Sequence, residues 1–381
     1  MNQKQKHNYM SDERKYTIQN LEEYIRQGEP QKRERGETWK VAIGLQQVDG
    51  LQTSEYLLDT AKKHIEGYIS IGEAKMLIDS YYKSAAGRKE VETNRTEEAD
   101  KVSTRITEIL AEKTFSFAPT QLTSIHRRLF EGIYKQAGRM RDYNITKNEW
   151  VLGGKTVYYA SADTISETLD YDMGQERNFN YTNLNVDDAI VHLARFCANI
   201  WQIHPFCEGN TRTTAVFMIK YLRTLGFNVV NDVFAEKSWY FRNALVRANY
   251  SDLTQGITET TTYLENFFRS LLLGEEHDLR NRIMHIEWNK MQNIDESQGA
   301  NATIQSAKAE DTLPPKCKNC TLEEIALLSI VKKNPFATQK EIAEQIGKSE
   351  RTIKTITVTL QKKDILRRAN GKRNGYWEII N

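Results

Sequence analysis

Residues 204–212 read HPFCEGNTR and interrupt two strongly apolar segments. The segment before them, VDDAIVHLARFCANIWQI (186–203), carries its apolar residues at helical spacing. The segment after them, TTAVFMIKYLRTLG (213–226), is apolar on nearly every side, which is typical of a helix in the middle of a domain. The nine residues are therefore a loop between two core helices, and they predict a mainly α fold.

Length and composition set outer limits. The chain has 381 residues, of which 39% are hydrophobic and 27% charged, with a formal net charge of +2. This length allows two or three domains with a sizeable core. No apolar run approaches the roughly 18 residues of a membrane span, and the first residues lack the apolar region of a secretory signal. We therefore expect a cytoplasmic protein with no membrane partner.

The cysteines give no sign of a metal site. Two of the four, Cys317 and Cys320, form a single CxxC with no second pair and no histidine nearby. A structural zinc site needs about four ligands, so we expect reduced thiols here.

The chain divides into five predicted parts. Polar composition and turn residues mark their boundaries. Within the second part, helices are expected near 17–27, 36–48, 53–66 and 72–84. The parts are a disordered N-terminus (1–12), a helical module (13–87), a helical core (88–275), a linker (276–318) and a C-terminal unit (319–381).

The opening stretch has the composition of a phosphate-binding site. A loop that begins a helix presents unpaired N–H groups to anions, and Gly209 lets the backbone approach a ligand closely. Asn210 and Arg212 can bond phosphate oxygens, and Glu208 can hold Mg²⁺. His204 is suited to taking a proton from a hydroxyl. Any one of these residues could merely cap a helix or make a turn, but their combination points to phosphoryl or nucleotidyl transfer.

HPFCEGNTR closely resembles the signature of Fic proteins, HPFx(D/E)GNGRxxR, and the similarity extends over roughly residues 100–273. IHRRLFEGIYKQAGRMRDYNI (125–145) is similar to the upstream helix and AG-x-x-R segment of that family. The resemblance implies transfer of AMP from ATP to a Ser, Thr or Tyr hydroxyl of a target protein, with Mg²⁺. It implies His204 as general base, Glu208 as Mg²⁺ ligand, and Gly209, Asn210, Thr211 and Arg212 as the phosphate cradle.

EWVLGGKTVYYAS (149–161) has two β-rich runs around Gly153-Gly154, which predicts a hairpin with a two-residue turn. By the resemblance it is the flap that holds the target segment through strand pairing. Its alternative reading is a plain surface hairpin. The expected target-binding residues are Glu149, Val151, Gly153, Gly154 and Val157. Phe241 and Arg242 lie where the family contacts the nucleotide base.

Two positions depart from the signature. Thr211 replaces the third glycine, and Ala215 replaces the second arginine, which in Fic enzymes contacts the γ-phosphate and pairs with an inhibitory glutamate. The N-x-R-T run at 210–213 also resembles the Doc branch, which transfers phosphate. Phosphoryl transfer or use of another nucleotide therefore stays open, as does a DNA-binding regulator whose Fic core senses nucleotide without turnover.

Residues 37–82 resemble the small antitoxin module that inhibits some Fic toxins through an (S/T)xxxE(G/N) motif. Here the aligned residues are LQQVDG (45–50), so leucine replaces the hydroxyl residue and Asp49 the glutamate before Gly50. Asp49 and Gly50 are the inhibitory candidates, and their alternative role is to end a helix. We expect any inhibition to be weak or to work through other contacts.

The C-terminal stretch ATQKEIAEQIGKSERTIKTITVTLQKKDILRR (337–368) reads as helix, glycine turn and helix, followed by two β runs. This is the pattern of a winged helix-turn-helix, for which DNA is the candidate partner and protein contact the alternative. Whether the chain forms a homodimer stays open. The expected DNA-binding residues are Arg351, Lys354, Arg367, Arg368, Lys372 and Arg373.

Overall fold

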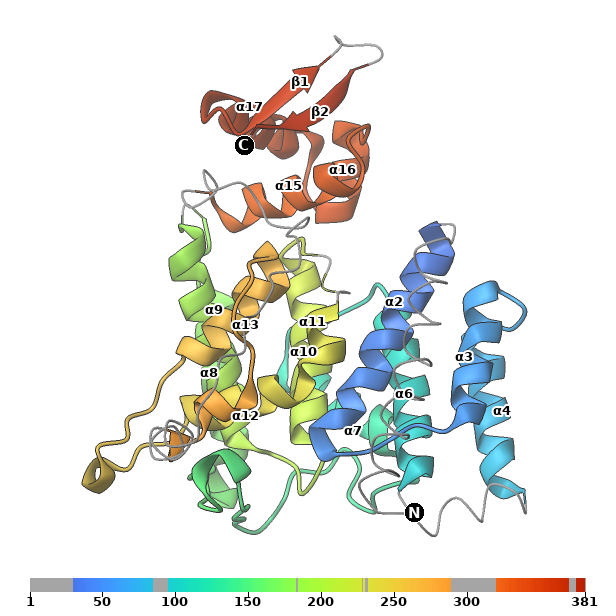
Figure 1. Cartoon of the computed structure of the whole chain (residues 1–381), viewed down its shortest axis with the longest axis vertical. Helices are drawn as coiled ribbons and strands as arrows, with labels where there is room; N and C mark the ends of the chain where they lie inside the picture. Colours follow the sequence, from blue (N-terminus) through green and yellow to red (C-terminus); the bar gives the residue numbers. More distant parts are fainter. Residues whose placement is uncertain are drawn as a thin grey trace, which may run out of the picture. The chain divides into compact units, whose positions relative to one another are not determined.

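The computed structural model describes residues 30–84, 95–182, 184–227, 229, 232–288, 320–369 and 375–380. These residues are mainly helical, with one two-stranded sheet near the C-terminus, so the predicted mainly α class is confirmed (Figure 1). The expectations for 1–12 and 17–27 and for Cys317, Lys372 and Arg373 lie outside the described residues.

Contacts divide the chain into two compact units. Unit 1 takes its described residues from Met1–Thr114, Arg127–Ala137 and Val230–Ser238. Unit 2 takes them from Phe115–His126, Gly138–Val229 and Trp239–Asn381. Helix α7 (Pro119–Phe130) therefore begins in unit 2 and ends in unit 1.

Unit 1 is built on α2, which packs against α3, α6 and α11, while α4 packs against α3 and α6. Trp39, Leu57 and Ile78 lie in its buried core. Ser54 accepts the Leu57 N–H and so caps α3. The helices are α2 (Pro30–Gly44), α3 (Glu55–Glu66), α4 (Ile71–Lys83), α6 (Thr96–Ala111) and α11 (Asp232–Glu236), with a 3₁₀ turn η1 at Leu45–Asp49.

A buried carboxylate connects the helices of unit 1. Asp100 on α6 is fully buried and accepts the N–H of Ser54 at 2.9 Å and the hydroxyl of Tyr82 at 2.6 Å. A buried carboxylate is stable only when its oxygens are hydrogen-bonded. The three residues therefore join α3, α4 and α6 through one polar site.

The helical part of unit 2 is arranged around α9 (Val186–Ile203), against which α8 (Ile165–Asn178), α10 (Asn210–Thr224) and α13 (Thr262–Leu273) pack. Every residue of α10 from Asn210 to Leu222 is buried, which confirms the expected central helix. The remaining helix of this part, α12 (Ser238–Ala248), precedes a 3₁₀ turn η4 at Leu253–Gln255.

The predicted two-residue β turn in the flap is wrong. Trp150–Leu152 instead form a 3₁₀ turn, η2, and the loop closes where the Glu149 N–H donates to the Lys155 carbonyl at 3.0 Å. Val151 and Leu152 are fully buried, so packing pulls this β-rich run inward instead of leaving it extended. The chain still reverses here, but without a strand ladder in the described flap.

The expected linker begins with ordered structure. Asn281–Met284 form the 3₁₀ turn η5, Met284 is buried, and the Ile286 N–H donates to the Val151 carbonyl at 3.0 Å. A second short turn, η3, lies at Ala162–Thr164 before α8. Residues 281–286 therefore pack against the flap at Trp150–Leu152.

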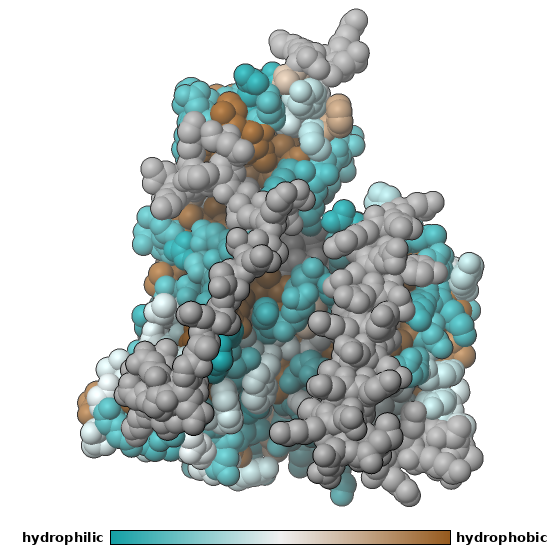
Figure 2. Space-filling view, viewed as in Figure 1, coloured by the Kyte–Doolittle hydropathy of each residue, from teal (hydrophilic) through white to brown (hydrophobic). Residues whose placement is uncertain are grey.

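The C-terminal unit has the predicted order of a winged helix-turn-helix. Thr321 and Thr338 each begin a helix with a capping box, and Ser349 caps the third helix. Figure 2 shows an apolar patch over this unit, which otherwise presents a mostly hydrophilic surface in that view. Its elements are α15 (Leu322–Lys333), α16 (Gln339–Ile346), α17 (Glu350–Lys362), and the antiparallel strands β1 (Leu366–Ala369) and β2 (Tyr376–Ile379).

Candidate active site

His204 ends helix α9 in a conformation that few residues adopt. Its φ is +49°, in the left-handed region, and Pro205 follows directly, although a residue before proline normally prefers an extended backbone. The side chain is only 3% exposed. Such a backbone persists only when its surroundings hold it in place, so His204 is a positioned residue.

The electrostatics of His204 suit a proton acceptor. Burial lowers its pKa well below the ordinary value, and the nearby Lys147 charge lowers it further, so the imidazole is neutral at pH 7. Its Nδ1 lies 3.2 Å from the Trp201 carbonyl. Because a carbonyl only accepts, Nδ1 carries the hydrogen and Nε2 keeps the lone pair.

The loop after His204 is held from inside. Phe206 is buried and stacks on His126, with ring centroids 3.7 Å apart. His126 in turn donates through Nε2 to the Glu208 carbonyl at 3.0 Å and accepts the Gly138 N–H at Nδ1. Phe206 is thus the buried anchor, and His126 was not expected from the sequence.

Asn210 and Thr211 hold the loop through hydrogen bonds of their side chains. The Asn210 amide accepts the Phe206 N–H at 3.0 Å and donates to the Phe206 carbonyl at 2.6 Å. Thr211 accepts the indole N–H of Trp201 at 2.8 Å. These bonds use only part of each side chain's hydrogen-bonding capacity, and the contact of Asn210 and Thr211 with phosphate stays a prediction.

The start of α10 is the anion-binding feature of the site. Gly209 stands at its N-cap with φ +75°, and no described side chain caps the helix there. The first N–H groups of a helix have no partner within it, and the helix dipole adds partial positive charge. Arg212, one turn in, is completely buried and its charge helps to lower the pKa of His126. The cradle is therefore made mainly of backbone.

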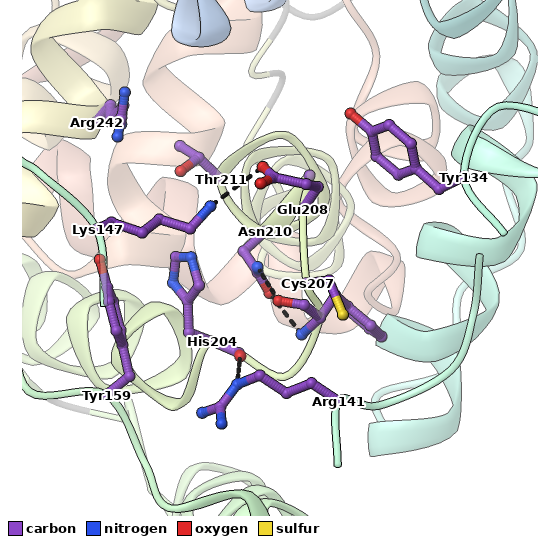
Figure 3. Close-up of polar contacts among 12 residues, drawn as sticks. Tyr134, Arg141, Lys147, Tyr159, His204, Cys207, Glu208, Asn210, Thr211 and Arg242 are labelled. Carbon is purple, nitrogen blue, oxygen red and sulfur yellow. Dashed lines mark hydrogen bonds and ion pairs between the residues drawn. The ribbon is translucent and has the colours of Figure 1, made fainter. Parts of the chain in front are cut away.

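Glu208 and Lys147 form an ion pair beside this cradle. Lys147 Nζ lies 3.1 Å from Glu208 Oε2, and Figure 3 shows the Lys147 side chain reaching past the His204 ring toward Glu208. The Glu208 side chain is 59% exposed. In the part of the chain that the structure describes, no group of three or more His, Cys, Asp or Glu could hold a metal. Mg²⁺ that arrives with nucleotide phosphates needs only one or two carboxylates, so Glu208 fits that metal.

Arg141 organises the lip of the site and was noted in the sequence only as part of AG-x-x-R. Its guanidinium donates to the carbonyls of His204 at 2.9 Å and Tyr143 at 2.8 Å, and also contacts the carbonyl of Ala160. Its own N–H donates to the Pro205 carbonyl at 2.8 Å. One buried arginine therefore ties the His204 turn to Tyr143, which precedes the flap, and to Ala160 at the end of the flap.

Two of the expected site residues are engaged elsewhere. Phe241 is fully buried and packs on Phe267, so its expected contact with a nucleotide base is wrong for this arrangement. Arg242 pairs with the buried Glu149 carboxylate at 2.8 Å, and the Tyr159 hydroxyl donates to the same carboxylate at 3.2 Å. Glu149 thus anchors the flap and does not face a target.

The other flap residues divide between anchors and surface. Val151 and Val157 bury their side chains, so the strand pairing expected of them would use their backbone, and their contact with a target stays a prediction. Gly153 and Gly154 are exposed and have positive φ. The aromatic side chains that this region exposes are those of Trp150 and Tyr158, at 48% and 82%. The accessible flap surface therefore includes Gly153 and Gly154, which the hairpin pattern singled out, and Trp150 and Tyr158, which it did not.

Asp49 and Gly50 lie in unit 1, where Asp49 ends the 3₁₀ turn η1. Gly50 follows with φ +68°, and its N–H donates to the Gln47 carbonyl at 3.0 Å. This geometry fits the helix-ending role of the pair. Their inhibitory role stays a prediction.

The basic residues of the C-terminal unit differ in their surroundings. Arg351 and Lys354 are exposed on α17. Arg367 pairs with Glu378 across the sheet, and Arg368 lies over the Trp377 ring at 4.7 Å. Arg351 and Lys354 are therefore the better-placed pair for phosphate contacts.

Among the described helices, none combines the length and apolarity that a bilayer crossing requires.

Comparison with known proteins agrees with these features. The family model described as Fic/DOC family matches residues 116–222, and a model described as winged helix-turn-helix DNA-binding matches residues 324–367. The curated protein adenylyltransferase VbhT of Bartonella schoenbuchensis is 23% identical over 158 residues. That match covers 36% of this chain and 32% of the relative, so the chain matches only about a third of that protein.

Among solved structures, a Fic family protein from Desulfovibrio desulfuricans G20 is similar with a TM-score of 0.42 and 12% identity, over 96% of each chain. The two family matches coincide with the loop–helix site and with the helix-turn-helix described above. Residues 116–222 thus match the Fic/DOC family, and residues 324–367 match a winged helix-turn-helix family.

Proposed function

We propose that this protein is a transferase that moves AMP from ATP to a hydroxyl group of a protein. The observation that carries the proposal is the neutral His204, with its Nε2 lone pair available, beside the uncapped start of α10 and the exposed Glu208 carboxylate. A proton acceptor, a metal-binding oxygen and an anion cradle are the parts that nucleotidyl transfer requires.

Each part has one task. His204 Nε2 takes the hydroxyl proton as the hydroxyl oxygen bonds to the α-phosphorus of ATP, and the bond from that phosphorus to the departing pyrophosphate breaks. The N–H groups at the start of α10 bind phosphate oxygens and stabilise their charge. Arg141 and the Asn210–Phe206 contacts keep the loop in the geometry that these tasks need. Mg²⁺ held by Glu208 would neutralise phosphate charge.

Mass spectrometry of the full chain after incubation with ATP and Mg²⁺ tests this proposal. We expect an adenylyl mass on the chain itself or on an added target protein, and its loss in His204→Ala. His277→Ala is a matched control, because it removes a partly exposed histidine outside the site. A product that persists in His204→Ala would refute the role of His204 as base.

The same experiment separates the other candidate reactions. Addition of a phosphate mass would indicate the phosphoryl transfer that the Doc-like 210–213 run allows. Binding of nucleotide without any covalent product would indicate a sensor that regulates the C-terminal unit. Either outcome would reject AMP transfer while leaving the geometry of the loop unchanged.

We also propose that the C-terminal unit binds DNA through α17, with Arg351 and Lys354 on phosphates. Electrophoretic shift of duplex DNA by the full chain should weaken when both residues become alanine, and the dependence of affinity on salt should become less steep. Lys333→Ala, at the exposed end of α15, is the matched control. Unchanged binding in the double variant would reject this surface.

A further inference from the structure

The arginines around the cradle are already committed to other groups. The Arg141 guanidinium donates to backbone carbonyls, and Arg242 pairs with the buried Glu149 carboxylate. Arg212 is completely buried, and its charge acts on His126. Ala215 is fully buried as well and offers no polar group. These four residues leave the side of the cradle that faces solvent without a guanidinium in this arrangement.

Lys147 places a cation at the open side of the cradle. Its ammonium contacts Glu208 at 3.1 Å, and its side chain keeps 24% of its surface exposed. Figure 3 places this side chain across the site between Tyr159 and Glu208, next to His204. The Lys147 N–H donates to the Thr156 hydroxyl oxygen at 3.0 Å, so the backbone at this point is fixed to the returning limb of the flap. The Lys147 backbone is therefore hydrogen-bonded to the flap, while its flexible side chain places the ammonium beside the phosphate-binding loop.

The contact with Glu208 is easily exchanged. Glu208 is more than half exposed, and an ion pair between partly exposed side chains contributes little, because water competes for both charges. A nucleotide triphosphate carries several negative charges and arrives at the helix N-terminus next to this ammonium. Lysine is a compact cation that suits phosphate oxygens, and its stem allows a short movement without any change in the backbone.

We propose that Lys147 is a phosphate-binding residue for the nucleotide: its ammonium exchanges the Glu208 carboxylate for a phosphate oxygen, and Glu208 becomes available to the metal. This inference rests on the proposed function, because it assumes that a nucleotide occupies the cradle. Lys147, which precedes the flap, would supply the positive charge that the buried Ala215 cannot supply. Lys147 would then neutralise the Glu208 charge before the nucleotide binds and contact a phosphate oxygen afterwards.

Isothermal titration calorimetry of the full chain with α,β-methylene-ATP and Mg²⁺ tests the proposal. Loss of a charge-assisted hydrogen bond to phosphate should weaken binding by about 10- to 100-fold in Lys147→Ala. Lys147→Arg should recover most of the affinity, because it keeps the charge. Adenosine alone, which has no phosphate, should bind wild type and Lys147→Ala equally.

Lys155→Ala is the matched control, because it removes a second flap lysine whose partner is Asp252 at 2.8 Å and not Glu208. Its affinity for α,β-methylene-ATP should stay within about twofold of wild type. Thermal unfolding of each variant shows whether the fold is kept, and Lys147→Gln provides a second neutral replacement of similar length.

The outcomes separate the two ideas. If wild type binds the analogue and Lys147→Ala binds it equally well or more tightly, Lys147 only blocks Glu208 and this inference fails while the proposed function stands. If wild type binds no analogue with Mg²⁺, the proposed function fails and the role of Lys147 fails with it.

Discussion

Glu149→Ala should loosen the flap far more than removal of the Lys155–Asp252 ion pair. The Glu149 side chain is 2% exposed and accepts from Arg242 at 2.8 and 3.1 Å and from Tyr159 at 3.2 Å. Removing one member of a buried pair costs about 3–5 kcal/mol, because the other charge stays without compensation. Arg242 is 19% exposed and can be partly rehydrated, so we expect the low end, about 3 kcal/mol.

Hydrogen exchange measured by mass spectrometry gives the local readout. At about 1.4 kcal/mol per factor of ten, a loss of this size should speed exchange of the flap amides roughly 100-fold. The informative amides are those of Glu149 and Gly154, whose N–H groups donate to the carbonyls of Lys155 and Glu149.

Asp252→Ala is the comparison, because it removes the Lys155–Asp252 pair from the same flap at a solvent-screened position. Its effect on flap exchange should be a few-fold at most. Arg242→Ala should loosen the flap like Glu149→Ala, and the double variant should add little to either. Equal exchange in Glu149→Ala and Asp252→Ala would refute the view that the buried pair holds the flap.

Three further predictions concern other parts of the chain. Burial lowers the pKa of His64, which accepts the Trp39 indole N–H, to about 4, below its ordinary 6.5. The neutral imidazole therefore contributes fully to the free energy of unfolding above pH 6.5, and this contribution falls by up to about 3 kcal/mol as the pH drops toward 4. Urea unfolding should show this loss in wild type and not in His64→Gln. Arg141→Lys should reduce automodification about 10- to 100-fold with little change in nucleotide affinity, because one ammonium cannot replace a fork that bonds several carbonyls. Asp49→Ala should leave automodification within about twofold, and a strong rise would show that this carboxylate inhibits.

The loop–helix site was predictable because it is local in sequence. Apolar spacing on both sides of HPFCEGNTR predicted two core helices, and α9 and α10 confirm them. Glycine at the helix start and acid and histidine on the loop follow from the chemistry of anion binding. Sequence reasoning therefore succeeded where neighbours in the chain are neighbours in space.

The conformation and contacts of the flap could not be predicted from the sequence. Its β-branched residues predicted strands, but Val151 is buried and Glu149 pairs with Arg242, which lies 93 positions away. Phe241 was expected at the nucleotide base, but it is buried against Phe267, which lies 26 positions later in the chain. Lys147 gave no local signal, because its importance depends on its distance to Glu208.

The path of the chain through unit 1 also limits how the protein can be dissected. Because unit 1 is assembled from three separate stretches, its N-terminal helices are not a removable cassette. Deleting residues 1–87 would leave α6 and α11 behind, and both pack against α2. The apolar faces of α6 and α11 would become exposed to solvent. Aggregation or altered activity of the truncated protein would therefore say nothing about the loss of an inhibitor. Single substitutions that keep α2 in place are therefore the informative genetic test of this region.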